Sequence, residues 1–345
     1  MNIQHIKDAR DINRTRDSVL VLGYFDGLHK GHRALFDQAR AITKRDQLDL
    51  TVLTFNESPH LALARFTPEL LLNLTAPEKR YEKFAEYGVD DLYLVDFTSA
   101  FSKVSSEEFL STYIKALRAR TIVVGFDYKF GHDRRDAAHL SEIFDGDVIV
   151  VPEVQDNGEK ISSSRIRQEI LSGNVSEVNR LLGYEFSTQG IVVHGDARGR
   201  TIGFPTANLA VLDRVYLPGE GVYVTDIIVS EKRYRSMTSI GKNVTFGGQD
   251  LRLEANIFDF ENDIYGETVE IIWLDKIRGM IKFAGADELV EQLKSDKKIA
   301  QNWGKNRKLF FKFCIIKLRR LERWFYDYFI FVTKLYKLPK STSLA

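Results

Sequence analysis

Short apolar runs alternate with amphipathic segments through the first 175 residues, and this alternation limits the fold more than any other feature of the chain. The runs are rich in β-branched residues and almost continuously hydrophobic, which is typical of parallel strands with both faces covered. They begin at Ser18, Leu48, Asp91, Thr121 and Asp147. Between them lie segments of helical pattern, such as residues 105–118, which start with a capping box of Ser105 and Glu108. The pattern predicts a doubly wound α/β sheet with ligands at the carboxyl ends of its strands.

The pattern changes near Gly183. From Thr188 to about Arg278, strand-like runs follow one another with Gly, Asn and Asp between several of them and no good helical segment. This arrangement predicts a compact antiparallel β-barrel, followed by a helix over residues 286–301. We therefore expect a first domain of residues 1–182, a second of residues 183–301, and a C-terminal extension of residues 302–345.

The extension differs from the two domains in charge and composition. It holds 11 of the 49 Lys and Arg residues but only 2 of the 48 Asp and Glu residues, a net charge of +9, whereas residues 1–301 carry a net charge of −8. It also holds 11 aromatic residues. A weak contact with an anionic membrane surface or a partner, through a basic amphipathic helix, is one interpretation. Packing on the acidic body of the same chain is another. A basic-aromatic contact with nucleic acid is a weaker alternative, and no nucleic-acid partner is expected, because the basic residues form no recognised module.

Several classes of protein are excluded by composition. The single cysteine, Cys314, cannot form a disulfide framework or a cysteine-based zinc site. No uncharged apolar stretch approaches 18 residues, so no transmembrane helix is expected. The first 18 residues contain no apolar run of the signal-peptide kind, and a cytoplasmic location is therefore the expectation.

Glycines and histidines follow the first strand-like run, in the sequence GYFDGLHKGH from Gly23 to His32. Glycines allow the backbone to approach a bulky anion. At a strand-to-helix junction, His29 and His32 can donate hydrogen bonds to phosphate oxygens, aided by the helix N-terminus. The alternative is a glycine-rich turn with two surface histidines. The chain has no GxxxxGK[ST] P-loop, so nucleotide binding of that type is excluded.

A second pattern suited to anions is ISSSRIR, which follows the last strand-like run of the first domain. Hydroxyls at a helix start, together with free N–H groups and the guanidinium groups of Arg165 and Arg167, can bind phosphate. The alternative is a serine N-cap with solvated arginines. Together the two patterns suggest a nucleotide with its α-phosphate near the histidines and its β- and γ-phosphates near Ser163, Ser164 and the arginines.

The barrel opens with a third loop of this kind, HGDARGRTIGFPTAN. Its glycines and arginines can wrap phosphates through the backbone. Thr206 and Asn208 offer neutral oxygens of the kind that suits a Mg²⁺ ion bridging substrate phosphates. Glu254 lies in the strand-like run LRLEANIFDF. It is either a solvated residue on an open sheet face or a general base for a substrate hydroxyl.

These motifs, in this order, resemble the bacterial bifunctional riboflavin kinase/FAD synthetase family over about residues 15–301. The resemblance rests on GYFDGLHKGH, VVGFDYKFG, ISSSRIR, GRTIGFPTAN, the GVY at Gly221–Tyr223, and LEANIFDFENDIYG. It implies that the first domain is a Rossmann-like nucleotidyltransferase, which adenylates FMN with ATP and Mg²⁺ and releases pyrophosphate. It implies that the barrel is a riboflavin kinase, which transfers the γ-phosphate of ATP to the ribityl 5′-hydroxyl.

The resemblance also implies roles for individual residues. His29 and His32 would stabilise the ATP phosphates during attack by the FMN phosphate, and Glu254 would be the base of the kinase. The pyrophosphate would be held by Ser163, Ser164, Arg165 and Arg167. Thr206 and Asn208 would bind Mg²⁺ and ATP phosphates. Further nucleotide or phosphate contacts are expected at Gly23, Phe25, Asp26, Gly31, Asp127, Gly195, Gly199 and Gly203, and a flavin contact at Arg278.

Two residues after the second strand-like run depart from the family pattern. Asn56 and Ser58 stand where the family often shows the Asp and His of TFDPHP. A narrower interpretation therefore keeps the kinase and weakens adenylylation. A third interpretation is a flavin- or RNA-binding regulator that has kept the scaffold. The intact pairs His29/His32 and Thr206/Asn208, together with Glu254, favour the enzyme.

Overall fold

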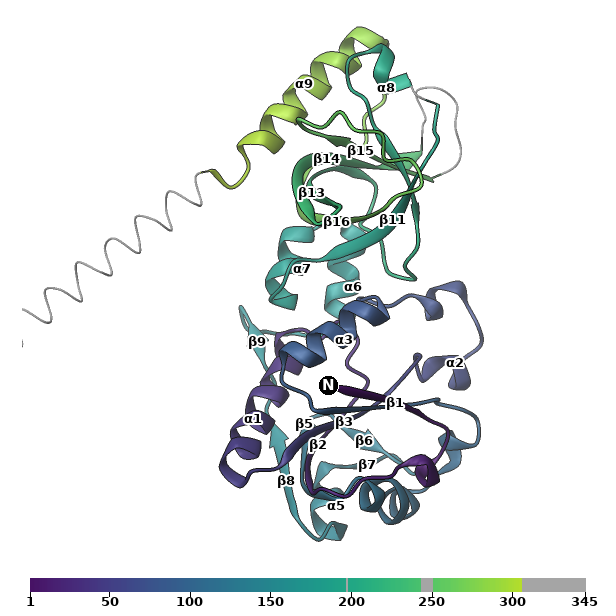
Figure 1. Cartoon of the computed structure of the whole chain (residues 1–345), viewed down its shortest axis with the longest axis vertical. Coiled ribbons are helices and arrows are strands. Elements are labelled where there is room, and N and C mark those ends of the chain that lie inside the picture. The colour runs from purple at the N-terminus through teal and green to yellow at the C-terminus, as the bar shows by residue number, and fades with distance from the viewer. Residues whose placement is uncertain (197, 243–250, 306–345) are drawn as a thin grey trace, which may run out of the picture.

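A computed structural model describes residues 1–196, 198–242 and 251–305. The first domain contains a parallel sheet with the strand order β1-β4-β3-β2-β5-β8 (Figure 1). Its strands are β1 (Asn2–Ile6), β2 (Ser18–Leu22), β3 (Asp49–Phe55), β4 (Asp91–Val95), β5 (Ala119–Gly125) and β8 (Asp147–Val151). The doubly wound α/β sheet expected from the sequence is confirmed.

Both faces of this sheet are covered. Along β2, Val19 and Val21 belong to one apolar cluster and Leu20 and Leu22 to another. Helices α1 (Lys30–Asp46) and α3 (Pro77–Glu86) contribute side chains to the first cluster. The second cluster contains side chains of α4 (Ser106–Phe109), the π-helical turn Leu110–Ile114 and α5 (Ala137–Ile143). Because each face of the strand meets a different set of side chains, the strand reads as a continuous apolar run. Ser105 caps α4 as expected, accepting from Glu108 N at 3.1 Å.

The second domain is a closed antiparallel barrel with the strand order β11-β12-β15-β14-β13-β16. Its strands are β11 (Ser187–Val193), β12 (Ala207–Val211), β13 (Gly221–Val229), β14 (Lys232–Lys242), β15 (Leu251–Ile257) and β16 (Thr268–Arg278). The barrel expected from the sequence is confirmed. Helix α9 (Ala286–Asn302) lies against the barrel wall, where its Ala300 packs with Val224 and Met237. The C-terminal extension expected from residue 302 falls almost wholly outside the described residues.

Two short helices join the domains, and both pack on the barrel (Figure 1). Helices α6 (Ser163–Ser172) and α7 (Val175–Leu182) place Ile166, Ile170 and Val178 in the same apolar cluster as Trp273 of β16. Polar contacts reinforce this packing: Asn179 Nδ2 donates to Trp273 O at 2.7 Å, and Lys276 Nζ donates to Ser172 O at 3.1 Å. The domain division at residues 182 and 183 stays a prediction, since these helices share the barrel's core.

A second link joins a barrel loop to the first domain. Asn73 N donates to Arg214 O at 2.8 Å, and Tyr216 N donates to Asn73 O at 3.1 Å. Arg214 also forms an ion pair with Glu57. The loop after β12 is thus fixed to the loop that precedes α3.

The remaining elements are short. They are α2 (His60–Leu63), β6 (Lys129–Phe130), β7 (Arg135–Asp136), β9 (Gln155–Asp156), β10 (Glu159–Lys160) and α8 (Arg198–Thr201), with 3-10 turns at Ala9–Asp11, Pro68–Leu71 and Phe101–Lys103. Within the described ranges, no helix has both the length and the apolar character needed to cross a membrane.

The packing of α6 on the barrel can be tested with two neighbouring residues. Ile170 is fully buried in the shared cluster, whereas Leu171 is 59% exposed. Ile170→Ala should lower the free energy of unfolding of the barrel by about 2–4 kcal/mol, because it removes buried methyl groups and leaves a cavity. Leu171→Ala should change it by less than about 0.5 kcal/mol. Urea unfolding of the full chain, followed by tryptophan fluorescence, measures both. Equal midpoints for the two variants would contradict the packing.

Candidate functional sites

A cavity of about 790 Å³ lies at the carboxyl ends of β2, β3, β5 and β8. Segments that follow each of these strands line it, as expected for an open α/β sheet. Of the site residues expected from the sequence, the lining includes Gly23, Phe25, His29, Gly31, His32, Asp127 and Ser163. The GYFDGLHKGH loop and the ISSSRIR segment therefore meet at one cavity. Asp127 Oδ2 accepts a hydrogen bond from Lys160 Nζ at 2.6 Å.

His29 and His32 lie face to face at the start of α1. Their ring centroids are 3.7 Å apart and the rings are nearly parallel. His29 is the N-cap of α1, since its Nδ1 accepts from His32 N at 3.3 Å. With Nδ1 accepting, the neutral ring carries its hydrogen on Nε2, which is then free to donate to a ligand. His29 is 5% exposed, so it is not the surface histidine of the alternative interpretation.

Burial keeps both rings neutral near pH 7. It lowers the pKa of His29 to about 4, and it lowers the pKa of His32 well below its ordinary value, with the neighbouring His29 adding to the effect. His32 Nδ1 is buried and has no hydrogen-bond partner among the described residues. The pair therefore offers neutral imidazoles to the cavity.

The loop before the histidines is tightly folded. Phe25 has a φ of 59°, a left-handed conformation that is uncommon for a residue with a side chain. Its ring packs edge-on against His32, with the centroids 5.3 Å apart. A Cβ atom at Gly23 would lie 2.7 Å from the Phe25 ring, so only glycine fits there. The loop thus holds the aromatic ring against the histidine.

Asp26 lies behind the cavity wall and ties the loop to α6. It is 4% exposed; its Oδ1 accepts from Leu74 N at 2.8 Å and its Oδ2 accepts from Arg167 at 2.6 Å. Ser163 Oγ donates to Asp26 O at 2.9 Å. Of these expected phosphate ligands, Ser163 lines the cavity, whereas Asp26 and Arg167 bind each other outside it.

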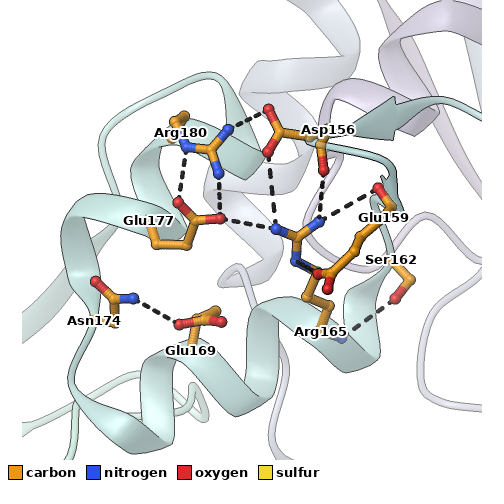
Figure 2. A network of polar contacts seen from close by, with 8 residues as sticks. All are labelled: Asp156, Glu159, Ser162, Arg165, Glu169, Asn174, Glu177 and Arg180. Carbon is orange, nitrogen blue, oxygen red and sulfur yellow. Dashed lines mark hydrogen bonds and ion pairs between the residues drawn. The ribbon is translucent and has the colours of Figure 1, made fainter.

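Arg165 does not line the cavity, and its guanidinium lies in a group of carboxylates (Figure 2). Its guanidinium lies 3.0 Å from Glu177 and 3.5 Å from Glu159, and it approaches Asp156 at 3.8 Å. Arg180 of α7 binds the same Asp156 and Glu177. This network joins the β9–β10 hairpin to α6 and α7. Ser164 is exposed and does not line the cavity, and Ser162 is the N-cap of α6.

Arg80 holds together two segments that line the cavity, and it was not among the residues expected from the sequence. It is 6% exposed and donates to Phe55 O at 3.1 Å, to Thr54 Oγ1 at 2.6 Å and to Tyr24 O. It therefore joins the loop after β2 to the end of β3, and both segments line the cavity. No pattern in the sequence marks it, because a single Arg on an amphipathic helix usually faces solvent.

Aromatic side chains form one wall of this cavity. Phe55, Phe101 and Phe109 lie in a chain of ring contacts that continues to Phe130, with centroid distances of 5.5–6.3 Å. Ring edges and faces of this kind suit a flat aromatic ligand.

A second cavity, of about 200 Å³, lies against the barrel wall beneath α8 and α9. Its lining includes the expected residues Gly199, Thr206, Asn208, Glu254 and Arg278. Thr206 Oγ1 lies 3.4 Å from Glu254 Oε2, and Asn208 pairs with Glu254 between β12 and β15. The strand register therefore places the carboxylate of Glu254 beside a hydroxyl and an amide that lie 48 and 46 residues before it in the sequence.

The remaining expected residues of the barrel are placed as follows. Gly195 lies beside Asn208, where a Cβ atom would come within 2.2 Å of the amide. Gly203 has a φ of 81° in the turn after α8 and does not line the cavity. Arg278 lines the cavity while its Nη2 binds the fully buried Asp296 at 2.8 Å. That ion pair joins β16 to α9 and fixes the position of the guanidinium.

A third cavity, of about 560 Å³, adjoins the second one at Thr206, which lines both. The segment from Phe260 to Tyr265 forms much of its wall. The ring of Tyr265 stacks on His194 with centroids 3.8 Å apart, and Arg200 donates to its hydroxyl at 3.2 Å. Ligands in the two cavities could thus meet at Thr206.

The fold and its cavities define a two-domain enzyme, in which a nucleotide-binding parallel sheet is joined to a kinase-type barrel. A family model described as FAD synthetase matches residues 11–165, and one described as riboflavin kinase matches residues 182–304. The chain is 41% identical over 290 residues to the bifunctional riboflavin kinase/FMN adenylyltransferase of Listeria monocytogenes, covering 83% of this chain and 91% of that one. It is 34% identical over 291 residues to the enzyme of that name from Escherichia coli K12, covering 83% and 92%.

The chain belongs to the bifunctional riboflavin kinase/FMN adenylyltransferase family. It is an enzyme of flavin cofactor biosynthesis with one kinase domain and one nucleotidyltransferase domain. A solved structure from Streptococcus pneumoniae, titled a macrolide-efflux protein, is 53% identical and superposes with a TM-score of 0.84 over 88% of this chain and all of its own. That likeness supports the two-domain fold described above.

Acidification should destabilise the fold through His29. The unfolded side chain takes up a proton near pH 6.5 and the folded one only near pH 4. Between these values the unfolded state binds more protons, so the free energy of unfolding falls as the pH decreases. His29→Asn keeps a capping side chain but does not titrate. Without nucleotide, the variant should lose about 2 kcal/mol less than the wild type between pH 7 and pH 4.5 in urea titrations.

Above pH 7 the two curves should run parallel, because His29 is neutral in both the folded and the unfolded states there. Parallel curves down to pH 4.5 would contradict the assigned burial effect.

Proposed function

We propose that the barrel phosphorylates riboflavin to FMN and that the parallel-sheet domain adenylates FMN to FAD, each step consuming one ATP. The proposal rests above all on the contact of Thr206 with Glu254 in one cavity and on the pair of His29 and His32 in another, separate cavity. The two chemistries differ in their need for a base, and we assign that role to Glu254 of the barrel cavity.

In the kinase step a neutral alcohol must lose a proton. Glu254 is the carboxylate beside Thr206, and we assign it the proton of the ribityl 5′-hydroxyl. The freed oxygen forms a bond with the γ-phosphorus of ATP, the bond from that phosphorus to the β,γ-bridging oxygen breaks, and ADP leaves with the electron pair. The two cavities that meet at Thr206 would bring flavin and nucleotide together there.

The donors in the barrel cavity fit Mg²⁺. Thr206 and Asn208 supply a hydroxyl and an amide oxygen, which are hard and neutral ligands. The described residues contain no cluster of three His, Cys, Asp or Glu side chains that could hold a metal by themselves. This agrees with an ion bound partly by substrate phosphates and water. When bound, Mg²⁺ would neutralise phosphate charge, and Thr206 and Asn208 would hold it.

In the adenylylation step the nucleophile is already an anion, so no base is required. An oxygen of the FMN phosphate forms a bond with the α-phosphorus of ATP, and the bond to the α,β-bridging oxygen breaks as pyrophosphate leaves. The Nε2–H of His29 can donate to a phosphate oxygen as charge shifts. The phosphate charge would raise the pKa of the imidazoles, so that nucleotide binding takes up protons. The aromatic wall of Phe55, Phe101 and Phe109 would hold the flavin ring.

Pyrophosphate binding falls first to Ser163, whose side chain lines the cavity. For Arg165 and Arg167 the predicted role requires each guanidinium to leave its carboxylate partners when phosphates arrive. Ser164, one residue further along α6, would need a phosphate at the outer edge of the helix N-terminus. We also propose a cytoplasmic location, because both steps consume ATP.

The narrower interpretation, a kinase with weakened adenylylation, rests on Asn56 and Ser58, which stand where the family often has Asp and His. Neither residue lines the first cavity, but His60 does. An imidazole is thus available two residues after the position where the family often has one. This favours a chain that carries out both reactions.

Replacing the base should separate the two activities. Glu254→Gln should lower the rate of FMN formation by at least about 100-fold, because an amide accepts no proton. FAD formation from supplied FMN should stay within about twofold of the wild type, since the carboxylate lies in the other domain. Chromatography of the flavin products measures both rates. Glu220→Gln, at an exposed position outside the cavities, is the matched control. Retention of kinase activity by Glu254→Gln would rule out its role as the base.

Replacing His29 should have the opposite effect. His29→Ala should abolish FAD formation from FMN and ATP and leave riboflavin phosphorylation intact. His29→Asn still caps α1, so a loss in both variants identifies the imidazole and not the cap as the essential group. The same product separation applies. Loss of both activities in the asparagine variant would show that the two sites are not independent.

A further inference from the structure

Asn256 has a buried acceptor atom that no residue of the described chain satisfies. It follows Glu254 by two residues on β15, so both side chains lie on one face of the strand and both line the barrel cavity. Asn256 is 5% exposed. Its Nδ2 donates to Pro205 O at 2.6 Å, while its Oδ1 has no hydrogen-bond partner. Leaving a buried amide oxygen without a donor is costly, which indicates that a ligand supplies one.

The orientation of this amide is fixed by its neighbour. Pro205 O can only accept a hydrogen bond, so the nitrogen of Asn256 must face it and the oxygen must face the other way. The free atom is therefore an acceptor. A phosphate oxygen, which also accepts, would be repelled there, whereas a hydroxyl would be bound.

We propose that Asn256 Oδ1 accepts a hydrogen bond from a secondary hydroxyl of the ribityl chain. This inference rests on the kinase reaction proposed above, in which Glu254 faces the terminal hydroxyl of the same chain. Two residues along a strand span about 7 Å. That distance suits a polyhydroxylated chain with its reacting end at Glu254 and an inner hydroxyl at Asn256. The amide thus selects a hydroxylated side chain on the flavin, while its nitrogen holds the loop that carries Thr206.

The two functions of the amide can be separated from the substrate side. Kinase kcat/KM is measured for riboflavin and for its 2′-, 3′- and 4′-deoxy analogues, with the wild-type chain and with Asn256→Ala. In the wild type, one deoxy analogue should be about 5- to 10-fold worse than riboflavin, the usual effect of one lost hydrogen bond. Asn256→Ala should remove that difference for the same analogue and keep the differences for the other two. FAD formation from FMN by the same variant reports whether the chain is folded.

An equal fall of kcat/KM for riboflavin and all three analogues would overturn the inference, because it would mean that Asn256 only anchors the loop or binds a water. If Asn256→Ala does not fold, a wild-type enzyme that uses all three analogues as well as riboflavin overturns it equally. Failure of the proposed function would look different: the wild type would then form no FMN from riboflavin at all.

Discussion

The packing of α6 against the barrel is the contact on which the arrangement of the molecule depends. The N-terminal end of this helix borders the cavity of the first domain through Ser163, and its buried residues Ile166 and Ile170 share a core with Trp273 of the second. A helix cannot expose such a face to water without losing the free energy of that burial. The two domains are therefore joined by a common core, and one segment that lines the first cavity is positioned by the barrel.

The two arginines expected to bind phosphate in the first site are already paired with carboxylates. Arg167 binds Asp26, and Arg165 shares Glu177 with Arg180. Buried ion pairs of this kind fix geometry more than they add stability. The cavity is lined by two imidazoles that burial keeps neutral, a serine hydroxyl and aromatic rings, together with charged side chains: Asp127, Lys129, Arg134, Glu153 and Lys160. An anionic ligand would meet cations and hydrogen-bond donors in this lining, whereas a contact with Arg165 or Arg167 would require an ion pair to open.

The sequence was sufficient for the sheet and the barrel, and most of the site residues expected from it line one of the two cavities, because local patterns decide these features. Strand hydrophobicity and the spacing of glycines, histidines and hydroxyls can be read directly from the sequence. The direction in which an arginine side chain points cannot be read from it. Arg165 was expected at phosphate and lies among carboxylates from β9, β10 and α7, whose proximity only the tertiary fold creates. Arg80 and Asn256 escaped notice for the same reason, since their partners are backbone carbonyls of distant loops.

The division of labour between the two cavities follows from the protonation state of each nucleophile. A phosphate monoester needs its attacking oxygen positioned and its leaving group stabilised, and histidines held neutral by burial can do this without competing for the nucleophile's charge. An alcohol needs a proton acceptor as well, and the proposed one is Glu254, which the register of β12 with β15 places beside Thr206. A carboxylate base would be of little use to the phosphate nucleophile of adenylylation. His29, which is neutral and has its Nδ1 engaged by His32 N, would be a poor base for an alcohol. The two reactions therefore require two sites, and the shared core of α6, α7 and the barrel fixes the domains that carry them against each other.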